Sequence, residues 1–309
     1  MRKRLLVLVL ILLIIPMGLG CSLFTSKNNQ ETLGVNEIMG KPVIQITTYP
    51  LYYFTTRIAG DTCDVHNFIP LGVEPHGWEP KPSDLVKLEE ADVLIYNGAG
   101  FEDWLVNLSN SVKNPGLVEV NSTEGIELLK DREGQNQEDP HVWLDPLRAQ
   151  GMALNIKNAL VELYPEKQQT LEDNYQKLVV ELEQLHQDYR EALADISKKE
   201  IIVTHNAFGY LAERYGLKQI PIMGVDAHAE PTPGKFKEII LLAKEQDIKY
   251  VFAEVMVSSK VIETLANEAD LRIGILNPLG NITQEDLDNG KDYFHIMYEN
   301  LEVLKKALK

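Results

Sequence analysis

The sequence predicts an α/β protein built as two βα sandwich lobes with parallel-type sheets, joined by one long rigid helix. Short runs of β-branched and apolar residues alternate with segments of helical periodicity from Val43 onward, and such alternation is typical of parallel sheets covered by helices. The alternation occurs twice, on either side of a long helical segment at residues 166–197. The chain of 309 residues also exceeds the usual size of one domain. We therefore expect an N-terminal lobe at residues 42–165 and a C-terminal lobe at residues 198–309.

The N-terminal lobe is expected to contain four strands and four helices. The strands are expected at Val43 to Thr47, Thr62 to Ile69, Val93 to Asn97 and Leu117 to Val120. The helices are expected at Leu51 to Ala59, Asp84 to Ala91, Glu102 to Ser109 and Pro146 to Leu163. The last of these ends before Pro165, because a proline disfavours the helical conformation of the residue that precedes it.

The segment 166–197 has the longest helical periodicity in the chain. Its apolar residues recur at three- and four-residue steps: Leu171, Tyr175, Leu178, Leu182, Leu185, Tyr189, Leu193 and Ile196. A helix of this length measures roughly 45 Å, which is too long for a crossover within one small sheet. We therefore interpret it as a linker helix between the lobes.

The C-terminal lobe repeats the alternation without repeating the residues. Its strands are expected at Ile201 to Thr204, Gln219 to Met223, Tyr250 to Ala253 and Arg272 to Leu276. Its helices are expected at Phe208 to Tyr215, Lys235 to Gln246, Lys260 to Ala269 and Asp292 to Leu308. Sheets of this kind bind ligands beyond the carboxyl ends of their strands, so the cleft between the lobes is the expected site.

The N-terminus is typical of an exported protein. Three basic residues precede an apolar run from Leu5 to Ile15 that is short for a membrane span, and small residues follow up to Gly20. We expect a signal peptide at residues 1–20 and acylation of Cys21, although Gly18 stands where a large aliphatic residue is more usual. Residues 21–41 are largely polar and aperiodic, and we expect them to form a flexible tether that holds the protein outside the cytoplasm, lipid-anchored to the cell membrane.

Charge and cysteine content exclude several classes of function. The formal net charge of −16 repels phosphates, so nucleic acid is not expected as a partner. The only cysteines are Cys21 and Cys63. If Cys21 is acylated, the chain can form neither an intramolecular disulfide nor a two-cysteine zinc site. A metal site would therefore use imidazoles and oxygen atoms.

The stretch EDPHVWLDP places His141 in a setting suited to a metal ligand. A ligating imidazole usually donates its second N–H to a carboxylate or carbonyl, and both Asp139 and Asp145 lie close in sequence. Trp143 can shield the ring from solvent, and Pro146 suits the first helical position behind an aspartate cap. A histidine that only hydrogen-bonds at a helix start would show the same local pattern.

Two other histidines follow expected strands. His76 lies in the proline-rich loop GVEPHGWEPKPSD, and His205 lies between a strand and a helix. His228, in the turn VDAHAEPTPG, is a second choice, whereas the remaining histidines lie within ordinary strand and helix patterns. His76, His141 and His205 are too far apart in sequence to share one helical face, so only the tertiary fold can bring them together. Imidazole nitrogens suit Zn²⁺, whereas sites for Mn²⁺ usually include carboxylates.

Five segments carry a resemblance to a known family. They are VEPHGWEPKPSDL around His76, DPHVWLDP around His141, THNAFGYLAERYGL around His205, FAEVMVSSK at residues 252–260 and LNPLG at residues 276–280. Over nearly the whole mature chain, the sequence resembles the metal-binding lipoproteins of bacterial zinc and manganese ABC importers, the cluster A-I solute-binding family. The resemblance implies a metal held between two lobes and delivered to a permease with a cytoplasmic ATPase. It also implies that His76, His141 and His205 are the ligands, and histidine at the third position favours zinc.

Two departures from the family pattern leave details open. The family often supplies an acidic fourth ligand near the C-terminus, where this chain has Asn277 and Gly280. Water, the Asn277 amide oxygen or Glu74 could complete the coordination. The segment DREGQNQED lacks the histidine-rich insertion of many zinc members, so manganese remains an alternative.

Two other functions are compatible with parts of the sequence. A three-histidine zinc hydrolase would have the same ligands, with Glu74 or Glu138 as general base, but the sequence contains neither an HExxH motif nor a nucleophile elbow. Some proteins of this resemblance also contact host surfaces as adhesins, and no residue of this chain tests that role.

Overall fold

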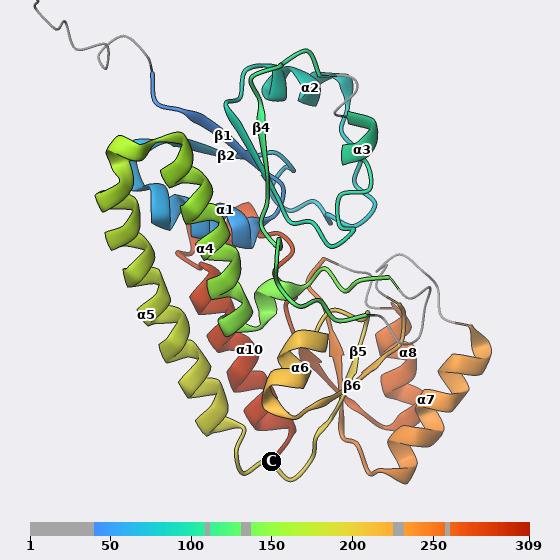
Figure 1. Cartoon of the computed structure of the whole chain (residues 1–309). Coiled ribbons are helices and arrows are strands. Elements are labelled where there is room, and N and C mark those ends of the chain that lie inside the picture. Colours follow the sequence, from blue (N-terminus) through green and yellow to red (C-terminus); the bar gives the residue numbers. More distant parts are fainter. Residues whose placement is uncertain (1–39, 109–111, 131–136, 225–231, 257–259) are drawn as a thin grey trace, which may run out of the picture. The chain divides into compact units, whose positions relative to one another are not determined.

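Two four-stranded parallel sheets, one in each lobe, form the framework of the chain (Figure 1). The structure is a computed structural model that describes residues 40–108, 112–130, 137–224, 232–256 and 260–309. The sheet orders are β2-β1-β3-β4 and β6-β5-β7-β8, so the first strand of each lobe lies between the next two. The strands are β1 (Val43–Ile46), β2 (Asp64–Asn67), β3 (Val93–Tyr96), β4 (Val118–Asn121), β5 (Glu200–Val203), β6 (Lys218–Pro221), β7 (Tyr250–Ala253) and β8 (Arg272–Ile275). The predicted fold class is confirmed.

Proline and aspartate set the starts of the first helices. The helices of this part of the chain are α1 (Tyr49–Ala59), α2 (Pro82–Glu89), α3 (Leu105–Leu108) and α4 (Pro146–Leu163). Proline occupies a first-turn position in α1, α2 and α4, and Asp145 caps α4 by accepting a hydrogen bond from the Leu147 N–H at 3.1 Å, as expected. Helix α3 begins at Leu105 rather than Glu102, because the Glu102 carboxylate is buried and accepts hydrogen bonds from the turn after β3.

The long helix α5 (Gln168–Ala192) is shorter than predicted and is not the only connection between the lobes. Residues Pro165–Lys167 form a separate 3₁₀ turn, and Leu193 ends the helix. The buried stripe of α5 packs against α1, α4 and α10 (Tyr293–Ala307). Packing among several helices, and not α5 alone, therefore connects the lobes. Among the described residues, no helix, α5 included, is long and apolar enough to cross a membrane.

Five helices follow β5 along the chain. They are α6 (Gly209–Tyr215), α7 (Pro233–Glu245), α8 (Lys260–Ala269), α9 (Gln284–Asp288) and α10. The short helix α9 was not predicted, because its residues QEDLD carry no apolar stripe. It begins at a Thr283 cap, whose hydroxyl accepts a hydrogen bond from the Asp286 N–H at 3.0 Å.

One apolar core runs through both lobes. It includes Ile44 on β1, Leu182 on α5, Val203 on β5 and Leu304 on α10, all fully buried. Smaller clusters lie within each lobe. Because packed interiors resist deformation, a core shared in this way opposes wide opening of the lobes.

The segment that follows β8 returns to the N-terminal lobe. The Asn281 side-chain amide donates hydrogen bonds to the carbonyls of Pro70 and Val73, each at 2.8 Å, and the Gly72 N–H donates to the Ile282 carbonyl at 2.8 Å. The backbone that leads into the His76 loop is thus held by residues more than 200 positions later in the chain.

Replacing Leu182 with alanine should destabilise the chain as a whole. Leu182 is fully buried, so Leu182→Ala removes apolar contacts and leaves a cavity, at a cost of about 2 to 5 kcal/mol in the free energy of unfolding. Urea denaturation followed by circular dichroism would measure it. Val180→Ala on the same helix is the control, since Val180 is 68% exposed and should change the free energy by no more than about 0.5 kcal/mol. Two separate transitions, one for each lobe, would contradict a shared core.

Candidate metal centre

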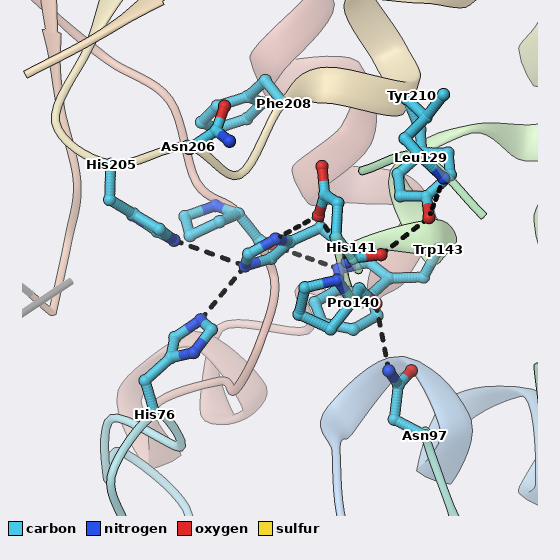
Figure 2. Close-up of polar contacts among 12 residues, drawn as sticks. His76, Asn97, Leu129, Pro140, His141, Trp143, His205, Asn206, Phe208 and Tyr210 are labelled. Carbon is cyan, nitrogen blue, oxygen red and sulfur yellow. Dashed lines mark hydrogen bonds and ion pairs between the residues drawn. The ribbon is translucent and has the colours of Figure 1, made fainter. Parts of the chain in front are cut away.

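Three histidine rings converge at the site, as predicted. The Nε2 atoms of His76 and His141 lie 3.0 Å apart, and those of His141 and His205 lie 3.3 Å apart (Figure 2). One ligand atom from each ring lies within 4.8 Å of the others. Four-coordinate zinc, with Zn–N bonds of about 2.0 to 2.1 Å, separates its ligand nitrogens by about 3.3 Å. The spacing therefore fits three ligands of a single ion.

Each ring comes from a different part of the fold. His76 lies in the loop between β2 and α2, His141 directly precedes the 3₁₀ turn Val142–Leu144, and His205 lies two residues beyond the end of β5. His141 and His205 are each 1% exposed, whereas His76 is only partly buried. The predicted position of His205 beyond the carboxyl end of a strand is confirmed.

Asp139 orients His141. One carboxylate oxygen, Oδ1, accepts hydrogen bonds from the His141 ring Nδ1–H at 2.8 Å and from the His141 backbone N–H at 3.0 Å. With its proton on Nδ1, the ring presents an unprotonated Nε2 to the centre of the site. The sequence left Asp139 and Asp145 as alternatives for this role. Asp145 instead caps α4 and binds the Arg214 guanidinium at 2.7 to 2.9 Å.

Glu254 orients His205 in the same way, and sequence reasoning did not single it out. Its Oε1 accepts from the His205 Nδ1–H at 2.7 Å and from the His205 backbone N–H at 3.2 Å. Glu254 directly follows β7, so an acidic residue immediately after a buried apolar strand was the signal that could have identified it. Because His141 and His205 both place lone pairs at Nε2, only 3.3 Å apart, a cation between them removes an unfavourable contact.

The two buried rings differ in proton affinity. Burial lowers the pKa of His141 well below its ordinary value of 6.5, and a charge on His205 lowers it further. Burial also acts to lower the pKa of His205, but the carboxylates of Glu254, Glu74 and Asp139 together outweigh it and raise that pKa above 6.5. As the pH falls, the metal-free site therefore takes up a proton on His205 before it takes one up on His141.

A buried carboxylate supports His141 from the N-terminal lobe. Glu102 accepts hydrogen bonds from the Thr47 hydroxyl at 2.5 Å and from the N–H groups of Asn97 at 2.8 Å and Gly98 at 3.0 Å. Burial raises the pKa of Glu102 to about 7, against the lowering effect of these bonds. The Asn97 amide in turn donates to the Pro140 carbonyl at 3.0 Å, next to His141 (Figure 2).

Aromatic side chains enclose two of the rings. Phe101 packs edge-on against His76 with ring centroids 4.9 Å apart, and Trp143 packs against His141 at 5.4 Å, as the sequence predicted. Trp143 is itself held by a hydrogen bond from its Nε1–H to the Pro278 carbonyl at 2.8 Å. These contacts restrict rotation of the two rings.

The residues considered as a fourth ligand lie at the edge of the site. Glu74 and Asn277 line the pocket with the three histidines, but among the described histidine, cysteine and acidic residues the close cluster contains only those three. The Asn277 side-chain oxygen accepts a hydrogen bond from the Leu279 N–H at 2.9 Å, so coordination by it would disrupt that turn. Gly280 also lines the pocket, packed against Pro75. His228, Cys21, the signal peptide and nearly all of the tether lie outside the described residues.

Comparison with known proteins gives concordant matches. Residues 44–307 match the family model described as zinc-uptake complex component A, periplasmic. The high-affinity zinc uptake system protein ZnuA of Bacillus subtilis is 36% identical over 293 residues, covering 91% of this chain and 92% of that protein. The zinc-binding lipoprotein AdcA of Streptococcus pneumoniae strain R6 is 34% identical over 300 residues, which cover 93% of this chain and 59% of the longer AdcA.

Three solved structures illustrate the similarity in fold. The metal-dependent lipoprotein YcdH of Bacillus subtilis has a TM-score of 0.77 at 39% identity, covering 87% of this chain and 100% of that one. The Zn(II)-bound ZnuA-like domain of Streptococcus pneumoniae AdcA has a TM-score of 0.77 at 35% identity, with coverage of 87% and 99%. The laminin binding protein Lmb of Streptococcus agalactiae, described as having adhesin and metal transporting activity, has a TM-score of 0.80 at 30% identity, with coverage of 87% and 100%.

Removal of the Glu254 side chain should weaken metal binding without unfolding the chain. Loss of a carboxylate that orients a ligating histidine typically lowers metal affinity by about 10- to 100-fold. Glu254→Ala should show this loss in a competition titration with a chromophoric chelator. Glu268→Ala, at an exposed position on α8, is the control and should bind as the unaltered chain does. Equal affinities for the two variants would show that Glu254 does not orient the ligand.

Proposed function

Because the chain belongs to the family of periplasmic component A of zinc-uptake complexes, we propose that it captures Zn²⁺ outside the cytoplasm and delivers it to an ABC importer. The observation that carries the proposal is the convergence of three imidazole Nε2 atoms at 3.0 and 3.3 Å. His76, His141 and His205 are the proposed ligands, with Asp139 and Glu254 fixing two of the rings. A water molecule, or Glu74 after a side-chain movement, completes the coordination sphere.

The ligand chemistry favours zinc over manganese. Three neutral imidazoles suit Zn²⁺, whereas Mn²⁺ prefers oxygen ligands, and the two carboxylates bound to His141 and His205 are directed at Nδ1 rather than at the ion. The named relatives support the same choice, since ZnuA of Bacillus subtilis is a zinc uptake protein and the AdcA domain holds Zn(II).

The importer, the membrane anchor and the division of the chain are part of the proposal. The partners are a permease and its ATPase, and residues 1–20 direct export. Acylated Cys21 anchors the chain to the membrane through the tether 21–41; the name of the AdcA relative, a lipoprotein, supports this anchoring. The lobes 42–165 and 198–309 hold the metal between them, on either side of the linker 166–197.

Delivery is proposed to involve loop movement with little lobe separation. The shared core and the Asn281 hydrogen bonds to the His76 loop support this view, because both resist hinge opening. The radius of gyration from solution scattering should be nearly the same with and without zinc. A large decrease on zinc binding would show that lobe closure, rather than loop movement, captures the ion.

A three-histidine hydrolase is the less favoured function. Glu138, one of the two general bases considered, is exposed and does not line the pocket. Zinc-dependent turnover of ester, peptide or phosphate substrates by the purified chain would reverse this preference.

Replacement of one ligand should abolish tight zinc binding. The unaltered chain should bind one zinc ion and retain it against excess manganese, whereas His205→Ala should lose at least 100-fold in zinc affinity, because removal of a direct ligand costs more than loss of an orienting group. Elemental analysis with zinc and manganese competition measures both. His295→Ala is a matched control, since exposed His295 also bonds an aspartate, Asp292, at 2.8 Å but lies outside the site. Tight zinc retention by His205→Ala would contradict the proposal. If the unaltered chain preferred manganese, the transported ion would be manganese rather than zinc.

Acidification should weaken zinc binding, mainly through His205. Its pKa is raised above 6.5 in the metal-free site, so below that pKa zinc must displace a proton, and affinity should fall by about tenfold for each pH unit. His141, whose pKa is lowered, stays unprotonated in this range and adds a second proton only at lower pH. Calorimetry in buffers of different ionisation enthalpy would count the protons released. Constant affinity between about pH 5 and 8 would contradict the proton competition.

A further inference from the structure

Gly209, the first residue of α6, leaves the space that the Asp139 carboxylate occupies. A Cβ at this position would lie 2.7 Å from Asp139 Oδ2, closer than carbon and oxygen atoms normally approach. We propose that Gly209 is a positioning residue for metal binding: its missing side chain allows Asp139 to hold the His141 ring in its ligating orientation. This inference rests on the proposed function of the site.

The Asp139 side chain cannot rotate away without cost. Its Oδ1 holds both the ring Nδ1–H and the backbone N–H of His141, and its side chain is only 4% exposed. Any rotation that relieves a contact with Gly209 lengthens these two hydrogen bonds. Without them, the His141 ring loses the group that fixes its tautomer and angle.

The Asp139 backbone cannot retreat either, because the same helix holds it. Tyr210, fully buried beside Gly209, donates its hydroxyl to the Asp139 carbonyl at 2.6 Å. The Leu129 N–H donates to that hydroxyl at 3.0 Å, and the Asp139 N–H donates to the Leu129 carbonyl at 2.8 Å (Figure 2). Helix α6 therefore fixes both the main chain of Asp139 and the space for its carboxylate.

Backbone geometry gives no other reason for glycine at this position. Gly209 does not have a positive φ angle, unlike Gly216 at the other end of α6. Alanine is a better helix former than glycine, so local preference alone would favour Gly209→Ala. The only close contact that a Cβ would make is with Asp139, since the nearest other side-chain atom, Leu129 Cδ1, lies at an ordinary 3.7 Å.

The start of α6 lies close in sequence to one ligand and contacts the residue that holds another. His205 lies four residues before Gly209, and His141 is fixed through Asp139 by Gly209 and Tyr210. Movement of α6 relative to residues 139–141 would therefore change the spacing of the two Nε2 atoms.

The test compares two glycines near helix starts. Gly209→Ala should lower zinc affinity by about 10- to 100-fold, the usual effect of disturbing an orienting group, and should weaken the visible bands of four-coordinate Co²⁺ in the same chain. Gly234→Ala, at the second position of α7, is the matched control, because its Cβ would meet only Thr232 Oγ1, at 3.9 Å. It should leave the affinity and the Co²⁺ spectrum unchanged.

A double-mutant comparison separates this role from a structural one. In an Asp139→Ala background the contact no longer exists, so Gly209→Ala should reduce zinc affinity by less than about twofold. If Gly209→Ala melts earlier than the unaltered chain, it should lower the melting temperature by less in the Asp139→Ala background. The proposal is wrong if Gly209→Ala binds zinc normally, or if its loss of affinity or stability is the same in both backgrounds.

A metal-free measurement distinguishes this inference from the proposed function. The hydrogen-bonded Nδ1–H proton of His141 should give a slowly exchanging NMR signal in the unaltered chain and in Gly234→Ala. This signal should be absent from the spectrum of Gly209→Ala. If the unaltered chain does not bind zinc tightly, the proposed function fails, and this signal still decides whether Gly209 positions His141. Retention of the signal in Gly209→Ala would overturn the inference.

Discussion

The hydrogen bond between a buried imidazole Nδ1–H and a buried carboxylate is the interaction on which the site depends. It occurs twice, from His141 to Asp139 and from His205 to Glu254, at 2.8 and 2.7 Å. In both cases the same oxygen also accepts the backbone N–H of its histidine. Burying an ionised carboxylate is costly unless it is paired, and each pair also turns an Nε2 lone pair toward the centre. The ligating rings are neutral and acidic side chains lie beside them, so the site favours a cation at its centre.

The framework around this site resists deformation on both sides. A single apolar core extends from β1 through α5 to β5, so the two lobes share a large part of their interior. Asn281 connects the end of the C-terminal sheet to the backbone before His76, and Tyr210 connects α6 to the backbone of Asp139. Residues of the second half of the chain therefore help to position ligands in both halves. Such preorganisation lowers the conformational entropy lost when the metal binds.

Much of this architecture could be predicted from the sequence, because regular patterns encode it. Alternating β and α periodicities gave both parallel sheets, and the Asp145-Pro146 pair correctly placed the start of α4. Their positions after expected strands or at a helix start identified the three histidines as candidates. Only the resemblance to a known family predicted that all three bind the same ion. Glu254 and Gly209 were missed as parts of the site, since their roles depend on contacts across 49 and 70 positions that no local pattern records. Helix α3 was predicted too long because nothing in its sequence indicates that Glu102 is buried.

The burial of the ligands bears on how the metal leaves. His205 is almost fully buried and held by Glu254, and His141 is equally buried and held by Asp139. His76 is the only one of the three rings that remains partly exposed. Withdrawal of His76 would leave the ion with two fixed imidazoles and access to water, without disturbing the shared core. For that loop to move far, the hydrogen bonds from Asn281 to the Pro70 and Val73 carbonyls would have to break. These hydrogen bonds, rather than a hinge between the lobes, therefore oppose release of the metal.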